Sequence, residues 1–292
     1  MSLSNAAPVT LPFEPAVLDH RRARARSTYD AAADRYDDAA LGFWARTGER
    51  TIERIGLGPG MSVLDVACGS GASALPAAKR VGPTGSVIGI DLSERLLELG
   101  RDKARRSGFD QLEFRLADMT ATGYPDAAFD SVVCVFGISF APDMEAQVAE
   151  LWRMVKPGGR LAITTWGPRL WSPMYETWRD IVRAERPDIV RDFHPWDRIT
   201  TPSAVAKLHT DAGIPRDAVR VLPEFDVWPL RSAHDWWSIV MGSGLRWTID
   251  QLDPAAVARV RAASLAYARK NDVASITCNV LYATATKPAA VD

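Results

Sequence analysis

The feature that most constrains the fold is an apolar run that ends in two glycines, residues 61–71 (MSVLDVACGSG). Its first half is rich in β-branched residues, which is typical of a strand buried on both faces of a parallel sheet. Residues 72–80 are predicted to form a helix, so backbone N–H groups at its N-terminus face whatever lies above the strand. Asp65 is the exceptional residue of this run, because burying a carboxylate in an apolar strand costs free energy unless the carboxylate binds a partner.

Three further apolar runs repeat this form. They end in Asp91, Asp118 and Phe136. Asp91 follows the first run by about twenty residues, the spacing of a carboxylate that binds both hydroxyls of a ribose. Strands that alternate with helices at this rhythm predict an α/β fold, a doubly wound sheet with right-handed crossovers. Ligands bind such sheets at the carboxyl ends of the strands, so a nucleoside-containing cofactor is predicted there.

Two classes of cofactor fit the glycine turn. Residues 69–74 satisfy the G-x-G-x-x-G/A spacing of dinucleotide-binding proteins, although that motif alone is a weak signal. Asp65 argues against NAD, because it would place negative charge close to a pyrophosphate. A cofactor with a sulfonium and an amino group instead of phosphates would be stabilised by the same carboxylate.

Residues 63–71 (VLDVACGSG) resemble the first motif of class I S-adenosylmethionine (SAM) methyltransferases, and within them the ubiquinone/menaquinone C-methyltransferase-like branch. The usual glycine two positions before Gly69 is Ala67 here, a departure expected to narrow the methionine side of the pocket. The resemblance implies a seven-stranded, mostly parallel sheet with the Rossmann-like methyltransferase fold. Its seventh strand would run antiparallel between the fifth and the sixth.

The resemblance also assigns cofactor contacts. Asp118 would accept from the adenine amino group, with Leu92 and Met119 as the apolar slot around the ring. Tyr29 and Tyr36 would close the methionine end with Trp44 beside them, and core packing is the alternative for each. The full predicted set is Tyr29, Tyr36, Trp44, Asp65, Ala67, Gly69, Gly71, Asp91, Leu92, Asp118, Met119 and Phe136.

We expect three parts along the chain: a disordered tail (1–16), a helical arm over the cofactor (17–60) and the SAM-binding methyltransferase domain (61–292). Insertions at about 168–200 and 231–272 are expected to form a helical lid over the cofactor edge. In the arm, the arginine cluster is expected to be a solvated helix face rather than a phosphate site. It comprises Arg21, Arg22, Arg24 and Arg26.

The sixth and seventh strands are predicted at 219–230 and 276–285. Of the 10 tryptophans, all but Trp44 and Trp152 lie at or after Trp166. Core packing explains some of them, but an aromatic-lined acceptor pocket is the natural complement of the lid. The six in the lid favour a flat or greasy acceptor over a charged metabolite. They are Trp171, Trp178, Trp196, Trp236, Trp237 and Trp247.

Composition restricts the partners. The 35 basic and 36 acidic residues nearly cancel, so no net field favours nucleic acid or an anionic membrane. We find no signal-peptide pattern and no apolar run of about 18 residues, and expect a cytoplasmic protein without a membrane span. Cys68, Cys134 and Cys278 fall in predicted strands and are expected to be buried and reduced. No cluster of residues has metal-ligand spacing, so no metal is expected.

These features predict a SAM-dependent methyltransferase that acts on a small apolar or aromatic acceptor, such as a quinone, a phenol or a natural-product-like molecule. Catalysis would consist mainly of alignment and exclusion of water. If the nucleophile must lose a proton, His194 in the lid is the candidate base, with a structural loop histidine as the alternative. Two other classes stay open: a SAM-binding regulatory or inactive protein, and an NAD(P)-dependent oxidoreductase.

Overall fold

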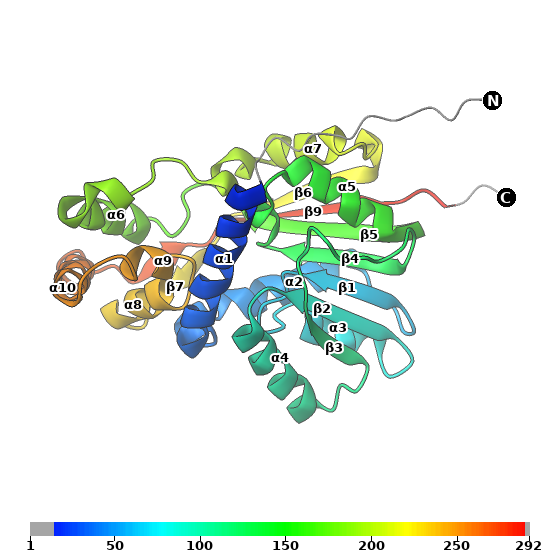
Figure 1. Ribbon diagram of the computed structural model, residues 1–292, viewed down its shortest axis with the longest axis horizontal. Helices are drawn as coiled ribbons and strands as arrows, with labels where there is room; N and C mark the ends of the chain where they lie inside the picture. The colour runs from blue at the N-terminus through cyan, green and yellow to red at the C-terminus, as the bar shows by residue number, and fades with distance from the viewer. Residues whose placement is uncertain (1–14, 290–292) are drawn as a thin grey trace.

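The computed structural model describes residues 15–289, so all but the last two residues of the expected tail lie outside the described part of the chain. Its centre is a seven-stranded sheet in the order β3-β2-β1-β4-β5-β9-β6, with helices on both faces (Figure 1). β9 alone runs antiparallel to its neighbours in this sheet, as the resemblance implied, and the predicted fold class is confirmed. The strands are β1 (Ser62–Val66), β2 (Ser86–Asp91), β3 (Leu112–Leu116), β4 (Phe129–Val135), β5 (Val155–Trp166), β6 (Val219–Glu224), β7 (Val227–Pro229), β8 (Ser275–Thr277) and β9 (Val280–Thr286).

The α-helices precede, connect and follow these strands in the alternation that the sequence predicted. They are α1 (Pro15–Tyr36), α2 (Phe43–Ile55), α3 (Ala74–Val81), α4 (Glu94–Ser107), α5 (Met144–Met154), α6 (Met174–Glu185), α7 (Pro202–Asp211), α8 (Ala233–Met241), α9 (Arg246–Ile249) and α10 (Pro254–Lys270). Several begin at a side-chain cap, as α4 does at Ser93, whose hydroxyl accepts from the Leu96 N–H, which satisfies one of the free donors of the first turn. No helix among residues 15–289 has the length and apolarity that crossing a bilayer requires.

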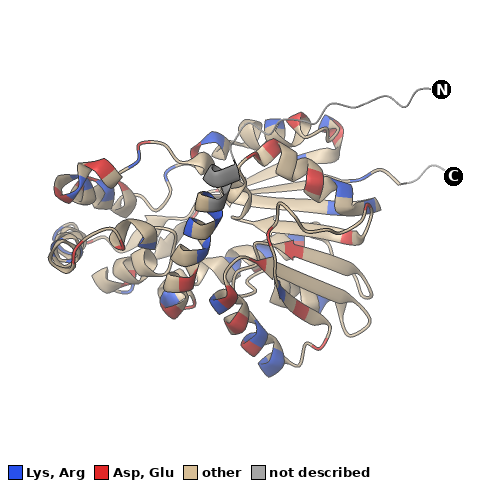
Figure 2. Cartoon of the chain, in the orientation of Figure 1, with Lys and Arg blue, Asp and Glu red and all other residues tan. Residues whose placement is uncertain are grey.

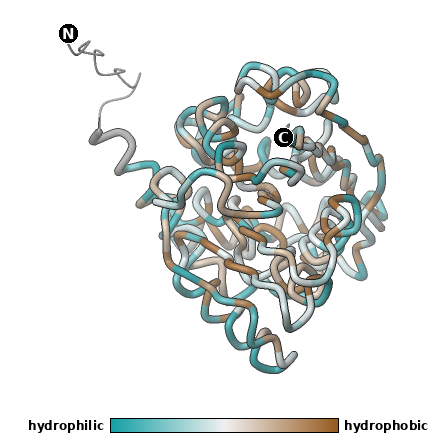
Figure 3. Tube along the Cα trace, turned by 90° about the vertical axis from the view of Figure 1, so that its right-hand side faces the viewer, coloured by the Kyte–Doolittle hydropathy of each residue, from teal (hydrophilic) through white to brown (hydrophobic). Residues whose placement is uncertain are grey.

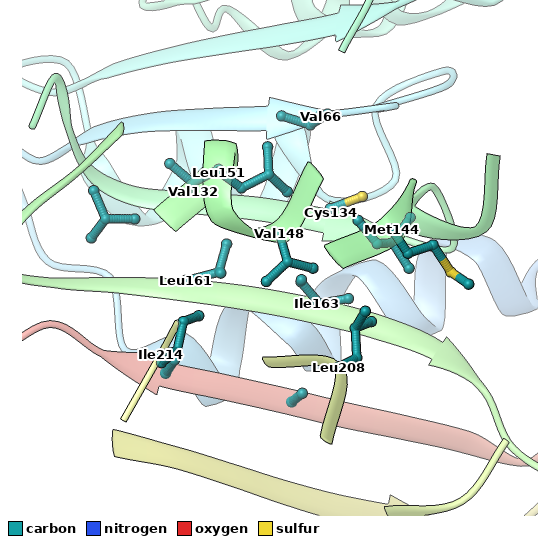
Figure 4. Packing of buried hydrophobic residues seen from close by; sticks show 14 of the residues in the cluster. Val66, Val132, Cys134, Met144, Val148, Leu151, Leu161, Ile163, Leu208 and Ile214 are labelled. Atoms are coloured by element: carbon teal, nitrogen blue, oxygen red, sulfur yellow. The ribbon is translucent and has the colours of Figure 1, made fainter. Parts of the chain in front are cut away.

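The two faces of the sheet bury different side chains, because successive residues of a strand point to opposite sides. In β1, Val63 packs with α2, α3 and α4, whereas Leu64 and Val66 pack with α5 and α7 on the other face. Figure 4 shows this second face, where Val148 and Leu151 of α5 lie over the strands. In Figure 3 the hydrophobic stretches run through the interior, and the outer turns are mostly hydrophilic.

Two strands that were predicted as single runs each divide in two, which corrects the sequence-based boundaries. β6 and β9 belong to the large sheet, whereas β7 and β8 pair only with each other as a two-stranded ribbon. The break is held by Asn279, whose side chain accepts from the Asp226 N–H (3.2 Å) and donates to the Pro168 carbonyl (2.8 Å). The ribbon therefore leaves the sheet and leads into the lid.

Smaller boundaries also differ from prediction. β5 begins at Val155, so the proline and the glycines of residues 156–159 (KPGG) already belong to the strand. Cys68 and Cys278 lie just beyond strands rather than in them. All three cysteines are nevertheless buried and unpaired.

The segments after β5 and after β7 carry α6 and α8–α10 beyond the carboxyl edge of the sheet (left in Figure 1). They bury a hydrophobic core of their own, which includes Trp178 of α6, Trp236 of α8 and Val260 of α10. Trp236 is fully buried. This tryptophan therefore packs the lid itself instead of facing a ligand.

Helix α2 packs directly on the glycine loop that follows β1. A Cβ atom at Gly48 would collide with the backbone of Ala72 and lie 2.8 Å from the Ser73 nitrogen. The close approach of α2 to the loop thus requires glycine at this position. It couples the N-terminal helices to the loop that the sequence assigns to the cofactor.

We expect Gly48→Ala to lower the midpoint of thermal unfolding. Alanine favours a helix over glycine by about 1 kcal/mol, but overpacking against backbone costs about 1–3 kcal/mol, and backbone cannot swing aside as a side chain can. Gly58→Ala is the matched control, because a Cβ there meets only the end of Met61 at 3.7 Å. A Gly48→Ala protein more stable than wild type would contradict this packing.

Candidate functional site

Two adjoining cavities lie at the carboxyl edge of the sheet. The first cavity, of about 100 Å³, lies over the ends of β1 and β2. The second, which we call the lid cavity, has about 230 Å³ and extends between α1 and the lid. Both are lined by a shared set of side chains, so a molecule in one touches the groups that bound the other. The shared residues are Ala25, Tyr29, Trp44, Phe136 and Phe140.

Asp91 forms the acidic floor of the first cavity at the end of β2. One carboxylate oxygen accepts from the Gly69 N–H (2.8 Å) and the other from the Ser93 N–H (2.9 Å). Burial raises its pKa, and these hydrogen bonds oppose the rise. Two backbone donors fix the plane of the carboxylate and leave further lone pairs for hydroxyl groups in the cavity.

The loop after β1 is strained at Ala67. This residue has φ 56°, in the left-handed region that favours glycine. Its Cβ is accommodated because position 137 is glycine: a Cβ on Gly137 would lie 2.5 Å from that of Ala67. Ala67, Gly69 and Gly137 all line the first cavity, so the departure from the usual motif is matched by a glycine on the neighbouring strand's loop.

Asp65 lies beneath this loop and is buried. Its Oδ2 accepts from the Ser73 hydroxyl (2.7 Å), whereas Oδ1 accepts no hydrogen bond from the described residues. Burial raises the pKa of Asp65 to about 7, against the hydrogen bond from Ser73, and the nearby Asp91 adds to the rise. An acid held in this way is neutralised either by a proton or by a cation close above it.

Helix α1 crosses over the first cavity and is fixed there by three acids: Asp30 and Asp34 on one face of the helix, and Asp37 one residue past its end. Their spacing of four and three residues brings them to the same side. The contacts join Asp30 to Ser93 (2.6 Å), Asp34 to Arg95 (2.5 Å) and Asp37 to Lys103 (2.6 Å). These residues were not predicted from the sequence, although their periodicity was a readable signal.

Aromatic rings enclose the end of the first cavity that adjoins the lid cavity. Tyr36 stacks on Trp44 with centroids 5.7 Å apart, and Tyr29 meets Tyr36 edge-on at 6.2 Å. Phe136 stacks on Trp166 at 3.8 Å. Burial raises the pKa of Tyr29 and of Tyr36, so both phenols are neutral at neutral pH.

The structure brings nine of the twelve predicted cofactor residues to the lining of the first cavity. They are Tyr29, Tyr36, Trp44, Ala67, Gly69, Asp91, Leu92, Met119 and Phe136. Asp65 lies beneath the loop. Gly71 has φ 92°, and a Cβ there would meet Phe114 at 2.9 Å, so it serves the turn and its packing.

Asp118 is also outside this lining, so its contact with the adenine ring stays a prediction. One oxygen lies 2.6 Å from Arg22 Nε. The other accepts from the N–H and the hydroxyl of Thr120, each at 2.8 Å. Its neighbours Ala117 and Met119 face the cavity instead.

The lid cavity is rich in tryptophan. Trp171, Trp178, Trp196 and Trp247 line it, together with Trp166 of β5. Two of the six tryptophans expected there, Trp236 and Trp237, do not line it and pack in the lid core. The pocket predicted from aromatic content is present, with four of the six residues that suggested it.

His194 also lines the lid cavity, beside a tyrosine that no sequence motif indicated. Its Nε2 lies 3.0 Å from the hydroxyl of Tyr175, and its ring stacks on Trp196 at 4.2 Å. Burial lowers the pKa of His194 to about 4, against the raising effect of Asp197. Burial also raises the pKa of Tyr175 to about 12. At neutral pH the pair consists of a neutral imidazole and a neutral phenol.

The arginine cluster of α1 is not simply the solvated face that we expected. Arg22 pairs with Asp118, and Arg26 lies 3.7 Å from Asp30. The guanidinium of Arg24 lies 3.3 Å from the ring centroid of Trp247. Both Arg21 and Arg24 line the lid cavity.

Comparisons with known proteins agree with this geometry. Residues 20–182 match the model of the ubiE/COQ5 methyltransferase family. The chain is 32% identical over 174 residues to nocamycin O-methyltransferase of Saccharothrix syringae, which covers 57% of this chain and 61% of that protein. It is 33% identical over 166 residues to the ubiquinone/menaquinone biosynthesis C-methyltransferase UbiE of Cupriavidus taiwanensis, with 56% and 68% covered.

The chain thus spans about six-tenths of the length of nocamycin O-methyltransferase. Among solved structures it is similar to the cyclase SpnF, with a TM-score of 0.53, 22% identity, and 84% of this chain and 81% of that chain covered. This likeness extends the fold beyond the 20–182 region, into the lid. The match to the family model ends at residue 182, before most of the lid.

The pKa of Asp65 leads to a prediction about stability. In the unfolded chain the pKa is about 3.9, and in the folded protein it is about 7. The stability contributed by the protonated acid is therefore complete below about pH 4 and is lost as the pH rises through 7. Asp65→Asn, which is neutral at every pH, should therefore gain more thermal stability relative to wild type at pH 8 than at pH 5.

Asp130→Asn is the control for this measurement by differential scanning calorimetry. There burial is outweighed by hydrogen bonds from Ser62 and Lys156, which hold the pKa of Asp130 below its usual value. The stability that this acid contributes is already present above about pH 4, so its loss should be the same at pH 5 and pH 8. An Asp65→Asn difference that does not change with pH would show that Asp65 is ionised throughout.

Proposed function

We propose, from the premise that the chain belongs to the ubiE/COQ5 methyltransferase family, that it transfers a methyl group from SAM to a small acceptor in the lid cavity. The observation that carries this proposal is the pair of adjoining cavities with a shared aromatic boundary. One cavity has the acids that a nucleoside with a cationic centre requires, and the other has the apolar surface that a small acceptor requires.

The residues of the first cavity fit SAM. The oriented carboxylate of Asp91 suits the two ribose hydroxyls, and Leu92 and Met119 offer apolar surface to the adenine ring. The unpaired oxygen of Asp65 favours positive charge above the loop. Tyr36 and Trp44 present ring faces of the kind that attract a sulfonium or ammonium cation. When bound, SAM supplies a methyl group already activated by its sulfonium.

The chain's own contribution to transfer is alignment and exclusion of water. Tyr29, Phe136 and Phe140 border both cavities, so they surround the place where the methyl group and the acceptor meet. Helix α1 covers this place and is fixed by the contacts from Asp30, Asp34 and Asp37. A cofactor of this size enters or leaves when those contacts open.

The acceptor we propose is a small, flat molecule, since six tryptophans line the lid cavity and supply stacking area. The relatives are consistent with this class: one is named for nocamycin and the other for quinone biosynthesis. NAD is poorly suited to the first cavity, because Asp65 places negative charge close to where its pyrophosphate would lie.

We expect Asp91→Ala to weaken SAM binding at least about tenfold. The carboxylate would accept charge-assisted hydrogen bonds worth about 1.5–3 kcal/mol each, and about 1.4 kcal/mol corresponds to a factor of ten. Isothermal titration with SAM measures the change. Asp118→Ala is the matched control, and it should bind SAM within about threefold of wild type, because its carboxylate is engaged by Arg22 and Thr120.

The comparison of the two variants decides between two arrangements. If Asp118→Ala loses as much affinity as Asp91→Ala, the Arg22 contact opens in the complex and Asp118 reads the adenine, as the resemblance implied. Wild-type affinity in Asp91→Ala would refute the ribose assignment. Titration of the wild-type protein with NAD separates the methyltransferase from the oxidoreductase.

A second prediction concerns His194 as the proton acceptor, with Tyr175 as a positioning residue through its hydrogen bond to Nε2. His194→Ala should lower kcat, and the affinity for SAM should not change. Because the pKa of His194 is about 4 rather than the usual 6.5, the wild-type rate should be constant above about pH 5 and fall below it.

Tyr175→Phe separates positioning from packing in the same assay. It removes the hydroxyl and keeps the ring, so it should raise the pH of the acid limb if the hydrogen bond helps to keep the imidazole neutral. Incubation with labelled SAM and a panel of quinones, phenols and aryl carboxylates supplies the acceptor. Undiminished turnover of His194→Ala would leave alignment as the whole of the catalysis.

A further inference from the structure

The charge on the wall of the lid cavity has one sign. Four arginines line it: Arg21, Arg24, Arg179 and Arg191. Among the described residues that line the same cavity, none is an aspartate or a glutamate. Figure 2 shows the basic positions along the part of α1 that passes the lid. For a chain whose total charge is close to zero, this is a strong local asymmetry.

The asymmetry is sharpest around Trp247. The guanidinium of Arg24 lies 3.3 Å from the centroid of this indole, and that of Arg191 lies 5.6 Å from it. Arg179, in contrast, is bonded to Asp192 (3.1 Å). Within the described part of the chain, no carboxylate forms an ion pair with Arg24 or Arg191. Two arginines therefore share one aromatic platform without an anion between them.

The electrostatics of neighbouring groups agree with this geometry. Burial lowers the pKa of Arg24 to about 10, and the adjacent charges of Arg191 and Arg21 lower it further. The pKa of His194 is lowered by burial and, to a lesser degree, by Arg179, Arg191 and Arg24. Like charges held together in a half-buried place repel each other, and an anion bound between them would offset this repulsion.

We propose that the acceptor carries a carboxylate, which Arg24 and Arg191 bind at the Trp247 end of the lid cavity while the apolar body of the acceptor packs on the tryptophans. This inference rests on the proposed function and deepens it by naming the acceptor class. It also replaces the expectation, drawn from aromatic content alone, that a charged acceptor is disfavoured. Stacking fixes the plane of a guanidinium and leaves its N–H edge free for a carboxylate.

The position of the pair along the chain links anion binding to methyl transfer. Arg24 precedes Ala25, which borders both cavities. Arg24, Arg191 and Trp247 thus line the same cavity as the boundary residues Tyr29, Phe136 and Phe140, so an acceptor whose carboxylate is held at Trp247 can present its body to the first cavity. Two contacts at one end and stacking along the body restrict the orientations that the acceptor can adopt.

The experiment compares two probes of nearly equal shape, 2-naphthoate and the uncharged 2-naphthamide, by titration calorimetry in the presence of SAM. Wild type should prefer the acid at least about tenfold, the discrimination expected of a charge-assisted hydrogen bond. The double variant R24Q/R191Q should lose that preference and keep its affinity for the amide. R198Q is the matched control, because Arg198 is in the same lid segment, bonds to Glu145 and does not line the cavity.

Every outcome of these titrations either supports or overturns the inference. Equal affinity of wild type for acid and amide, a preference that survives in R24Q/R191Q, or no binding of the acid at millimolar concentration would each overturn the inference. If the double variant does not fold, R191Q alone, at an exposed position, should reduce the preference for the acid. If wild type does not bind SAM, the proposed function is overturned instead. Titration of wild type with SAM alone measures this separately from the comparison of acid and amide.

Discussion

The arrangement of the whole site depends on two carboxylates buried side by side under one glycine loop. Asp91 is held by two backbone N–H groups, and Asp65 is held by one serine hydroxyl and repelled by Asp91. Two acids so placed cannot both be ionised cheaply without a cation. The strand ends, the strained turn at Ala67 and the close packing of α2 on the loop all keep them together. The fold thus maintains a place whose electrostatics are completed by a positively charged ligand.

Helix α1 connects this place to the lid, and the charges in its middle oppose the order that a helix alone would favour. A cluster of arginines at residues 21–26 precedes Asp30 and Asp34, whereas the helix dipole favours acids toward the N-terminus and bases toward the C-terminus. Tertiary contacts explain this order. Asp30, Asp34 and Asp37 bind the loops and helix around the first cavity, and Arg24 reaches Trp247 of the lid. Sequence periodicity was sufficient to reveal the acidic face, but not its partners.

The sequence predicted those features that repeat along the chain. Asp91 was identifiable because an acid follows an apolar run at a regular distance from the glycines, and β9 followed from the resemblance. The division of residues 219–230 was not predictable, because the run favours a strand throughout and Asn279, distant in sequence, sets the break. The partner of Asp118 was not predictable for a similar reason: its position at the strand end is regular, but the sequence does not show that its carboxylate pairs with Arg22 of α1. Tyr175 had no motif, since only the folded lid brings it to His194.

The two cavities have complementary charge, and this bears on the chemistry more than the fold does, since one fold serves many reactions and the cyclase SpnF shares this one. The first cavity is acidic and suits a sulfonium, while the lid cavity is basic and suits an anion. The positive charge of a sulfonium in the first cavity and the negative charge of an acceptor in the lid cavity would attract each other across the boundary, and this attraction is stronger where water is excluded. Tyr29, Phe136 and Phe140 provide that boundary, so the aromatic wall between the cavities has a chemical as well as a steric role.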